Sequence, residues 1–447
     1  MGSKWQQIPL GQLISLQRGH DLPTQNRVNG QIPVMGSSGL TGWHNVSKCT
    51  GPGVVIGRSG NSMGVVSYSD SDFWPLNTCL YVTDFKGNDE KYIYYMLQQI
   101  DFDKFNSGSA QKSLNRNAVY PYNVMATIDI EEQKSIGKIL ANFEDKITLN
   151  RQINQTLEQM AQTLFKSWFV DFDPVVDSAL DAGFFEQDLG FSEELLHRVE
   201  VRKAVRESDN FKPLSEDIRR LFPNAFEECA EPALGLGGWV PKGWKGQPIK
   251  THCVKIQNGG TPSRSNSDYW DGGNIPWLTS GEVRQSIVTN VENTITDLGL
   301  QNSSAKWVSS YSTLVALYGA TAGEVSINVD PLTTNQAVCA LIPKESYCWF
   351  NYLQVRNKTI EMQNQAVGSA QQNISKRLVE NLIVISPLPY IVEIFNQRVE
   401  PLFLKSIFNQ KMAMELTKLR DTLLPKLISG ELSLSDIKID IPEETLI

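Results

Sequence analysis

The sequence has few cysteines and histidines, and they are not arranged as a metal site or a disulfide framework. Six cysteines are spread over 447 residues without a C-x-x-C pair, and the four histidines stand apart from them. Structural zinc sites and disulfide-rich domains need clustered ligands or closely spaced cysteines. We therefore expect buried free thiols and no bound metal ion.

Long apolar runs are missing as well. No stretch approaches the roughly eighteen apolar residues that a membrane-spanning helix needs. The N-terminal residues MGSKWQQIPLGQL lack the charged and apolar regions of a secretory signal. We expect a cytoplasmic protein without membrane contact.

A basic surplus, which proteins that neutralise phosphates usually carry, is also absent, because the net charge is −8. Residues 171–237 account for this value, with 7 Lys and Arg against 16 Asp and Glu, and the rest of the chain is near neutral. The charge therefore neither supports nor excludes a nucleic-acid partner. We interpret residues 171–237 as an acidic, partly ordered connector.

What the chain does contain is a long tandem repeat. Matching phrases recur in the same order: IPVMGSSG (32–39) and IPWLTSG (275–281), VVIGRSGNSMGVVS (54–67) and VALYGATAGEVS (315–326), GSAQKSL (108–114) and GSAQQNI (368–374). A period this long indicates two copies of one domain and not a solenoid. Short β-branched runs between Gly, Asn, Ser and Pro turns predict strands of a mixed sheet in each copy.

Each copy then changes to a heptad pattern, which predicts two long helices that pair. Apolar residues alternate in steps of four and three from Ile136 and, in the second copy, from Phe395. Asn150 and Asn409 share one seam position, where they either mark the helix register or lie partly exposed at a helix edge. We expect Pro401 to begin the long part of the second helix, because proline fits a first turn.

Polar side chains around glycines, and no catalytic motif, recur in both copies. Arg and Lys can pair with guanine, Asn and Gln with adenine, and Ser and Thr with phosphates or bases, although turns also favour Ser and Asn for backbone reasons. The candidate DNA-contacting residues are Ser37, Ser38, Arg58, Ser59, Asn61, Asn77, Ser109, Gln111, Lys112, Asn115, Arg116, Thr279, Ser280, Arg284, Thr321, Asn335, Gln336, Ser369, Gln371, Gln372 and Lys376.

The combination of these phrases resembles the DNA-specificity subunits of type I restriction-modification systems. The resemblance rests on tandem IPVMGSSG, VIGRSGNSMG and GSAQKSLNR phrases, a following EEQKSIGKIL helix and a LFPNAFEE…LGGWVPKGW bridge, and it covers essentially the whole chain. It implies a mixed α/β fold. Two tandem target recognition domains would be separated by a pair of long antiparallel coiled-coil helices with pseudo-twofold symmetry.

The patterns and the resemblance together predict six segments. They are target recognition domain 1 (1–135), spacer helix 1 (136–170), the acidic connector (171–237), target recognition domain 2 (238–388), spacer helix 2 (389–430) and a C-terminal tail (431–447). Phe165, Trp168 and Phe169, near the end of the first helix, are candidates either for partner contact or for packing within the chain.

The resemblance also implies a non-catalytic role. In this family the two domains read the halves of a split site in double-stranded DNA. Two modification (methyltransferase) subunits methylate adenine with S-adenosylmethionine, and restriction subunits that use ATP and magnesium can join them. We expect no cofactor in this chain, which lacks the Asp-Pro-Pro-Tyr and Asn-Pro-Pro-Tyr motifs of amino methylation. A coiled-coil scaffold with duplicated protein-binding domains, and an enzyme that binds a small ligand at its Gly-rich loops, are the alternatives.

Overall fold

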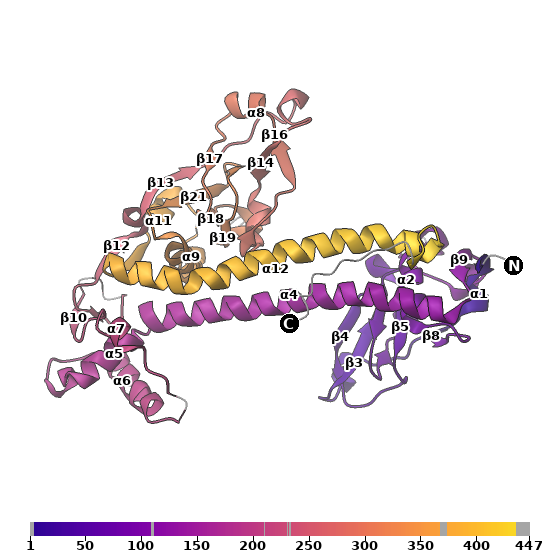
Figure 1. The fold of residues 1–447 in the computed structure, drawn as a ribbon, viewed down its shortest axis with the longest axis horizontal. Helices are drawn as coiled ribbons and strands as arrows, with labels where there is room; N and C mark the ends of the chain where they lie inside the picture. Colours follow the sequence, from indigo (N-terminus) through magenta and orange to yellow (C-terminus); the bar gives the residue numbers. More distant parts are fainter. Residues whose placement is uncertain are drawn as a thin grey trace. The chain divides into compact units, whose positions relative to one another are not determined.

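The computed structural model describes residues 4–108, 111–209, 211–229, 231, 234–366 and 373–434. The chain divides into two compact units: unit 1 comprises Met1–Asn150 and Met412–Ile447, and unit 2 comprises Arg151–Lys411. Two long helices, α4 (Ile130–Phe169) and α12 (Pro389–Ser429), each contribute one segment to either unit. Both are uninterrupted in Figure 1.

Unit 1 is built from three small sheets and short helices. Its strands are β1 (Trp5–Pro9), β2 (Ser15–Arg18), β3 (Ile32–Gly36), β4 (Gly39–His44), β5 (Gly53–Gly57), β6 (Val66–Ser69), β7 (Trp74–Pro75), β8 (Cys79–Asp84) and β9 (Asn123–Thr127). The strand orders are β2-β8-β5-β6, β4-β3-β7 and β1-β9. The helices are α1 (Leu10–Leu13), α2 (Glu90–Gln98) and α3 (Arg116–Val119).

The core of unit 1 forms where α2 packs on the four-stranded sheet. All five residues of β5, GVVIG, are buried. Asp89 caps α2 because its carboxylate accepts a hydrogen bond from the backbone N–H of Tyr92 at 2.8 Å. Ile136 and Leu140 of α4 and Leu427 of α12 belong to the same core. The long helices are therefore an integral part of this unit.

Unit 2 has the same plan with additional elements. Its strands are β10 (Phe226–Glu228), β11 (Trp239–Pro241), β12 (Lys245–Pro248), β13 (Cys253–Asn258), β14 (Ile275–Leu278), β15 (Ile287–Val288), β16 (Asn293–Ile295), β17 (Trp307–Val308), β18 (Thr313–Ala316), β19 (Val325–Asn328), β20 (Leu332–Thr334), β21 (Val338–Pro343) and β22 (Ile383–Ser386). The sheet orders are β13-β21-β18-β19-β15, β16-β14-β20-β17, β12-β22 and β10-β11. The shorter helices are α5 (Asp173–Asp181), α6 (Glu193–Arg206), α7 (Glu216–Arg219), α8 (Asp297–Gln301), α9 (Cys348–Asn357), α10 (Thr359–Asn364) and α11 (Lys376–Glu380).

Hydrogen bonding shows that the two units repeat one domain. The order β2-β8-β5-β6 in unit 1 matches β13-β21-β18-β19 in unit 2. The N–H of Arg58 donates to the Thr78 carbonyl oxygen at 2.9 Å, and the N–H of Leu317 donates to the Ala337 carbonyl oxygen at 2.8 Å. The prediction of a mixed α/β chain with two tandem domains is confirmed.

The long helices pair antiparallel, as the contacts within unit 2 show. Asn409 Nδ2 donates to Asn154 Oδ1 at 3.0 Å, and the ring centroids of Trp168 and Phe395 lie 5.8 Å apart. Residue numbers thus rise along α4 while they fall along the paired stretch of α12. The prediction of two long antiparallel helices is confirmed.

The first long helix starts earlier than its apolar pattern predicts. It begins at Ile130, whereas the heptad pattern places the start at residue 136. Asp129 Oδ1 accepts hydrogen bonds from the backbone N–H groups of Glu131 at 3.1 Å and Glu132 at 3.4 Å. This polar cap begins the helix, and a count of apolar positions does not detect it.

Pro401 lies inside α12, so the prediction that it begins the long part of this helix is wrong. Proline has no N–H to donate to the carbonyl four residues earlier, which weakens a helix. Val399, Phe403 and Ile407 flank it and are buried in the core of unit 2. We infer that this packing holds the helix together across the missing hydrogen bond.

The two seam asparagines are buried, with 3% of Asn150 and 2% of Asn409 exposed. The alternative of a partly exposed helix edge is therefore wrong. Asn409 donates to Asn154, and Asn154 Nδ2 donates in turn to the Ser406 carbonyl oxygen at 2.9 Å. A buried polar layer of this kind favours one helix register, and the register role of Asn150 stays a prediction.

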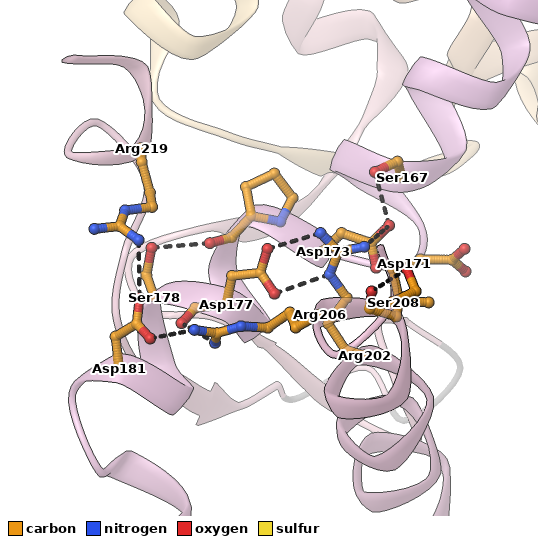
Figure 2. Close-up of polar contacts among 12 residues, drawn as sticks. Ser167, Asp171, Asp173, Asp177, Ser178, Asp181, Arg202, Arg206, Ser208 and Arg219 are labelled. Atoms are coloured by element: carbon orange, nitrogen blue, oxygen red, sulfur yellow. Dashed lines mark hydrogen bonds and ion pairs between the residues drawn. The ribbon is translucent and has the colours of Figure 1, made fainter. Parts of the chain in front are cut away.

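Residues 171–237 are more structured than the expected connector, because their described part includes α5, α6, α7 and β10, and its apolar residues join the core of unit 2. Ion pairs join α5 to α6 and to the end of α7. Arg202 Nε lies 2.8 Å from Asp177 Oδ1, and Asp181 accepts from both Arg206 at 2.5 Å and Arg219 at 2.9 Å (Figure 2). Arginines thus neutralise part of the acidic charge inside the fold.

Aromatic residues at the end of α4 complete the core of unit 2. Phe165, Trp168 and Phe169 are buried, and the Trp168 ring packs edge-on against Phe222 at 4.9 Å. Of the two alternatives for these residues, packing within the chain is correct.

A buried histidine makes the stability of unit 2 depend on pH. His252 Nε2 lies 2.5 Å from the Ser386 hydroxyl, and burial lowers the pKa of His252 to about 4. Its pKa in the unfolded chain is about 6.5, so the unfolded state binds the extra proton first as the pH falls. We expect the contribution of neutral His252 to the free energy of unfolding to be complete above pH 6.5. The free energy of unfolding should fall by about 3 kcal/mol by pH 4.

Urea titrations at several pH values test this expectation. His252→Gln should flatten the pH dependence between pH 4 and 6.5, whereas His197→Gln, a change at an exposed histidine of α6, should leave it as in the wild type. An unchanged pH profile in the His252→Gln protein would contradict the assignment.

Candidate nucleic-acid interface

A polar groove opens in unit 1 beside the end of β2. Its volume is about 640 Å³. It is lined by Gln17, Arg18, Gly19, His20, Asp21, Arg58, Leu80, Ser107, Ser113, Leu114, Asn115 and Arg116. Most of these residues are polar, and three of them are arginines. The groove therefore suits a charged, polar ligand.

Backbone carbonyl groups hold the three arginines. Arg18 Nε and Arg58 Nη1 both donate to the carbonyl oxygen of Asn77 at 3.4 Å, and Arg116 Nη1 donates to the carbonyl oxygen of Leu16 at 2.9 Å. None of the three forms an ion pair within the described part of the chain. Guanidinium groups without a carboxylate partner favour a phosphate or the acceptor edge of a base.

Asn106 holds two described residues of the phrase GSAQKSL, Gly108 and Ser113. Asn106 Oδ1 accepts hydrogen bonds from the backbone N–H groups of Gly108 and Ser113, each at 3.0 Å. Lys112 Nζ lies 2.8 Å from both carboxylate oxygens of Asp103. The lysine that sequence reasoning placed on DNA is thus already paired within the protein.

Unit 1 brings three predicted residues, Arg58, Asn115 and Arg116, into the groove. Asn115 also caps α3 by accepting from the N–H of Asn117 at 3.0 Å, and Ser37 Oγ donates to the Thr78 carbonyl at 2.9 Å. Ser38, Asn61 and Gln111 are exposed, Ser59 is half-buried, and Ser109 lies outside the described residues.

In unit 2 several predicted residues are engaged in the fold. Thr279 forms a capping box with Glu282, and the Asn335 side chain accepts from the N–H of Ala337 at 3.0 Å. Thr321 is buried, Ser280 is half-buried, Arg284 is exposed, Lys376 pairs with Glu380 at 3.0 Å, and Ser369, Gln371 and Gln372 lie outside the described residues.

One amide contact recurs at the same place in both units. The Asn77 amide donates to the carboxylate of Asp21 in unit 1, and Gln336 Oε1 accepts from the Thr261 hydroxyl at 2.5 Å in unit 2. The backbone supports this correspondence, because β7 and β20 are followed by the same turn, which pairs with the loop after β2 and β13 respectively. The two units therefore share the backbone of this turn and differ in the side chains that it carries.

Sequence reasoning missed Arg18, His20 and Arg264. Arg18 and His20 line the groove of unit 1. The Arg264 guanidinium of unit 2 lies 3.7 Å from the ring centroid of Trp270, so stacking holds it flat. Arg18 could have been found, because it stands opposite Asn258 in the repeat alignment. Nothing in the sequence marks Arg264, because its partner ring is set by the fold.

The described residues include no group of three or more His, Cys, Asp or Glu that could hold a metal ion. Over the same ranges, no helix is long and apolar enough to cross a membrane. The six cysteines are free thiols, three buried and three half-buried. The groove of unit 1 therefore remains the site with the clearest ligand chemistry.

Comparison with known proteins finds a matching family profile and similar sequences. The sequence profile of the type I restriction modification DNA specificity domain matches residues 2–159 and 241–422. The chain is 32% identical over 316 residues to the type I restriction enzyme HindI specificity subunit of Haemophilus influenzae, with 68% of each chain covered. It is 23% identical over 359 residues to the MjaIX specificity subunit of Methanocaldococcus jannaschii, with 78% of this chain and 70% of that chain covered.

A solved structure shows the same fold. The S subunit of a type I restriction-modification system from M. genitalium aligns with a TM-score of 0.59 at 14% identity, covering 95% of this chain and 96% of that chain. The profile matches span most of the chain and fall once in each copy of the repeat. The chain therefore belongs to the family of type I restriction-modification DNA specificity subunits.

Proposed function

We propose that this chain directs a type I restriction-modification complex to a bipartite site in double-stranded DNA, and that each unit reads one half of the site. The recurrent amide contact carries the proposal, because Asn77 and Asp21 in unit 1 stand where Gln336 and Thr261 stand in unit 2. Two readers of different base sequences need a common backbone frame with different polar side chains.

The long helices give this arrangement its physical advantage. Both α4 and α12 contribute to the two units, so the units are joined through two helices and not through a flexible linker. Once one unit binds its half-site, the other meets DNA at a high effective concentration. Two weak contacts can then act as one specific contact, and the bases between the half-sites go unread.

Catalysis is assigned to partner subunits. The chain lacks both motifs of amino methylation, Asp-Pro-Pro-Tyr and Asn-Pro-Pro-Tyr. We propose that it recruits two modification subunits, which carry S-adenosylmethionine and methylate adenine. Restriction subunits that use ATP and magnesium would join the same assembly, and this chain would bind no cofactor of its own.

A DNA-retention experiment separates this proposal from a protein scaffold. The chain, assembled with its modification subunit, is titrated with salt on duplexes that contain or lack the selected site, and the modification subunit alone is the control. The logarithm of the binding constant should fall linearly with the logarithm of salt concentration, and the binding constant should favour the site by about 10³-fold or more. Equal retention on both duplexes would favour the scaffold.

A domain exchange tests the modular reading of the site. Replacing residues 4–127, which contain β1 to β9, by the corresponding segment of another family member should change one half of the site and keep the other. The exchange ends before Ile130, where α4 begins, so the helix pairing is kept. Methylation mapping gives both halves at once, and a change in both would contradict the proposal.

A further inference from the structure

We infer that unit 1 reads a guanine in its half-site through Arg58, while Arg18 and Arg116 contact the phosphate backbone at the mouth of the same groove. This inference rests on the proposed function and adds the class of base that one unit recognises. It follows from the way the three arginines are held, from their different exposure and from what stands at the same places in unit 2.

The three arginines are held in place by the protein itself, before any ligand binds. Arg18 and Arg58 share the carbonyl oxygen of Asn77. Asn77 is itself fixed, because its side-chain amide donates to Asp21 and its backbone N–H donates to the His20 carbonyl oxygen at 3.0 Å. A guanidinium has five N–H donors, so Arg58 keeps a free edge after this bond.

The groove is lined by three guanidinium groups and one carboxylate, Asp21, so it keeps a surplus of positive charge. No described carboxylate pairs with Arg18, Arg58 or Arg116. Asp21, which lines the same groove, accepts a hydrogen bond from the Asn77 side chain. The missing counter-charge can come from phosphates, and guanine offers O6 and N7 to the fork of an arginine.

Arg58 differs from the other two arginines in exposure, and this difference favours it for the base contact. Arg58 is half-buried, whereas Arg18 and Arg116 are exposed. It directly follows the buried strand β5 and precedes the tight turn at Gly60. A half-buried side chain on this fixed backbone suits a base edge, and the exposed arginines suit phosphates.

Unit 2 carries other residues at the places of the three arginines. Leu317 stands at the position of Arg58 and is fully buried, and Asn258 stands at the position of Arg18. Lys376 follows its helix cap as Arg116 does, but it is paired with Glu380. Unit 2 therefore has no arginine at these three places, and the contact assigned to Arg58 has no counterpart at Leu317.

The test uses the full chain assembled with its modification subunit. Binding-site selection is run with the half-site of unit 1 randomised, first on the wild type and then on Arg58→Gln, because glutamine pairs with adenine and not with guanine. We expect about a 10- to 100-fold loss of preference for guanine at one position of that half. The half read by unit 2 should be unchanged.

Matched variants separate base reading from folding and from phosphate contact. Arg27→Gln removes an equivalent bond, from Arg27 Nη1 to the Thr41 carbonyl at 3.0 Å, outside the groove lining, and should keep the base preference. Arg18→Gln and Arg116→Gln should weaken binding to all sequences and lower the salt slope by about one each. Thermal melting of every variant, with Arg58→Ala as a second substitution, monitors folding.

Three outcomes are distinguishable. Unchanged base preference in folded Arg58→Gln and Arg58→Ala proteins would overturn the inference. So would a uniform loss of affinity on all sequences, because it would place Arg58 on a phosphate. If the wild-type assembly itself shows no sequence preference, the proposed function fails, and that result precedes any comparison of variants.

Discussion

Replacing Asp177 by alanine is expected to lower the free energy of unfolding of unit 2 by about 3–5 kcal/mol. Arg202 donates to both carboxylate oxygens of Asp177, at 2.8 and 2.7 Å, and the two side chains are only 11% and 15% exposed. Alanine would leave the guanidinium largely buried, with Asp173 Oδ2 at 4.0 Å as its remaining carboxylate. Urea denaturation followed by tryptophan fluorescence measures the loss.

Two further variants show whether burial causes the effect. Glu216→Ala breaks the exposed pair with Arg220, whose side chains are 65% and 71% exposed, and should change stability by at most about 0.5 kcal/mol. Replacing Asp177 by leucine together with Arg202 by methionine should recover most of the loss, since no unpaired charge remains. Equal effects of Asp177→Ala and Glu216→Ala would contradict the account.

Four residues inserted into α4 after Asn150 and four into α12 after Lys411 are expected to lengthen the unread gap by about two base pairs. Four residues add about 6 Å, roughly one helical turn, so each seam keeps its direction. One base pair spans about 3.4 Å of DNA. The insertions fall where the two units divide, so neither recognition domain is altered. Methylation mapping reports the new gap.

A matched insertion shows whether the helices set this distance. Four residues added after Gly190, in a loop of the connector where a side chain would meet no atom within 4 Å, should leave the gap unchanged. The parental gap in the helix variant, or an altered gap in the loop variant, would show that the helices do not act as a ruler.

Much of this fold could be predicted because duplication and heptad spacing are repeated signals. A single residue carries less information, as Pro401 shows: its rule is sound for an isolated helix, yet burial of Val399 and Phe403 overrides it. The start of α4 depends on one polar cap, at Asp129, and not on periodicity. The partner of Asn409 could not be predicted either, because antiparallel pairing brings Asn154 to it from the other helix.

The candidate site was less predictable, since side-chain direction and competing partners are set by tertiary contacts. Lys112 is of the right residue type for a phosphate contact, but its ammonium group is paired with Asp103. Thr321 has the right type too, but it is buried. Arg58 and Arg116 were found from residue type. Arg18, which the repeat alignment places opposite Asn258, joins them because β2 ends beside the Asn77 turn. Residue type thus indicated which kinds of side chain line the site, and the fold determines which individual residues do so.

Mapping methylated adenines in the DNA of a host that carries this chain and its modification partner tests the central claim most directly. Two units that each read one half predict one motif made of two short specified blocks separated by a gap of fixed length and unspecified sequence. A continuous motif, a gap of variable length or no sequence preference would contradict the account.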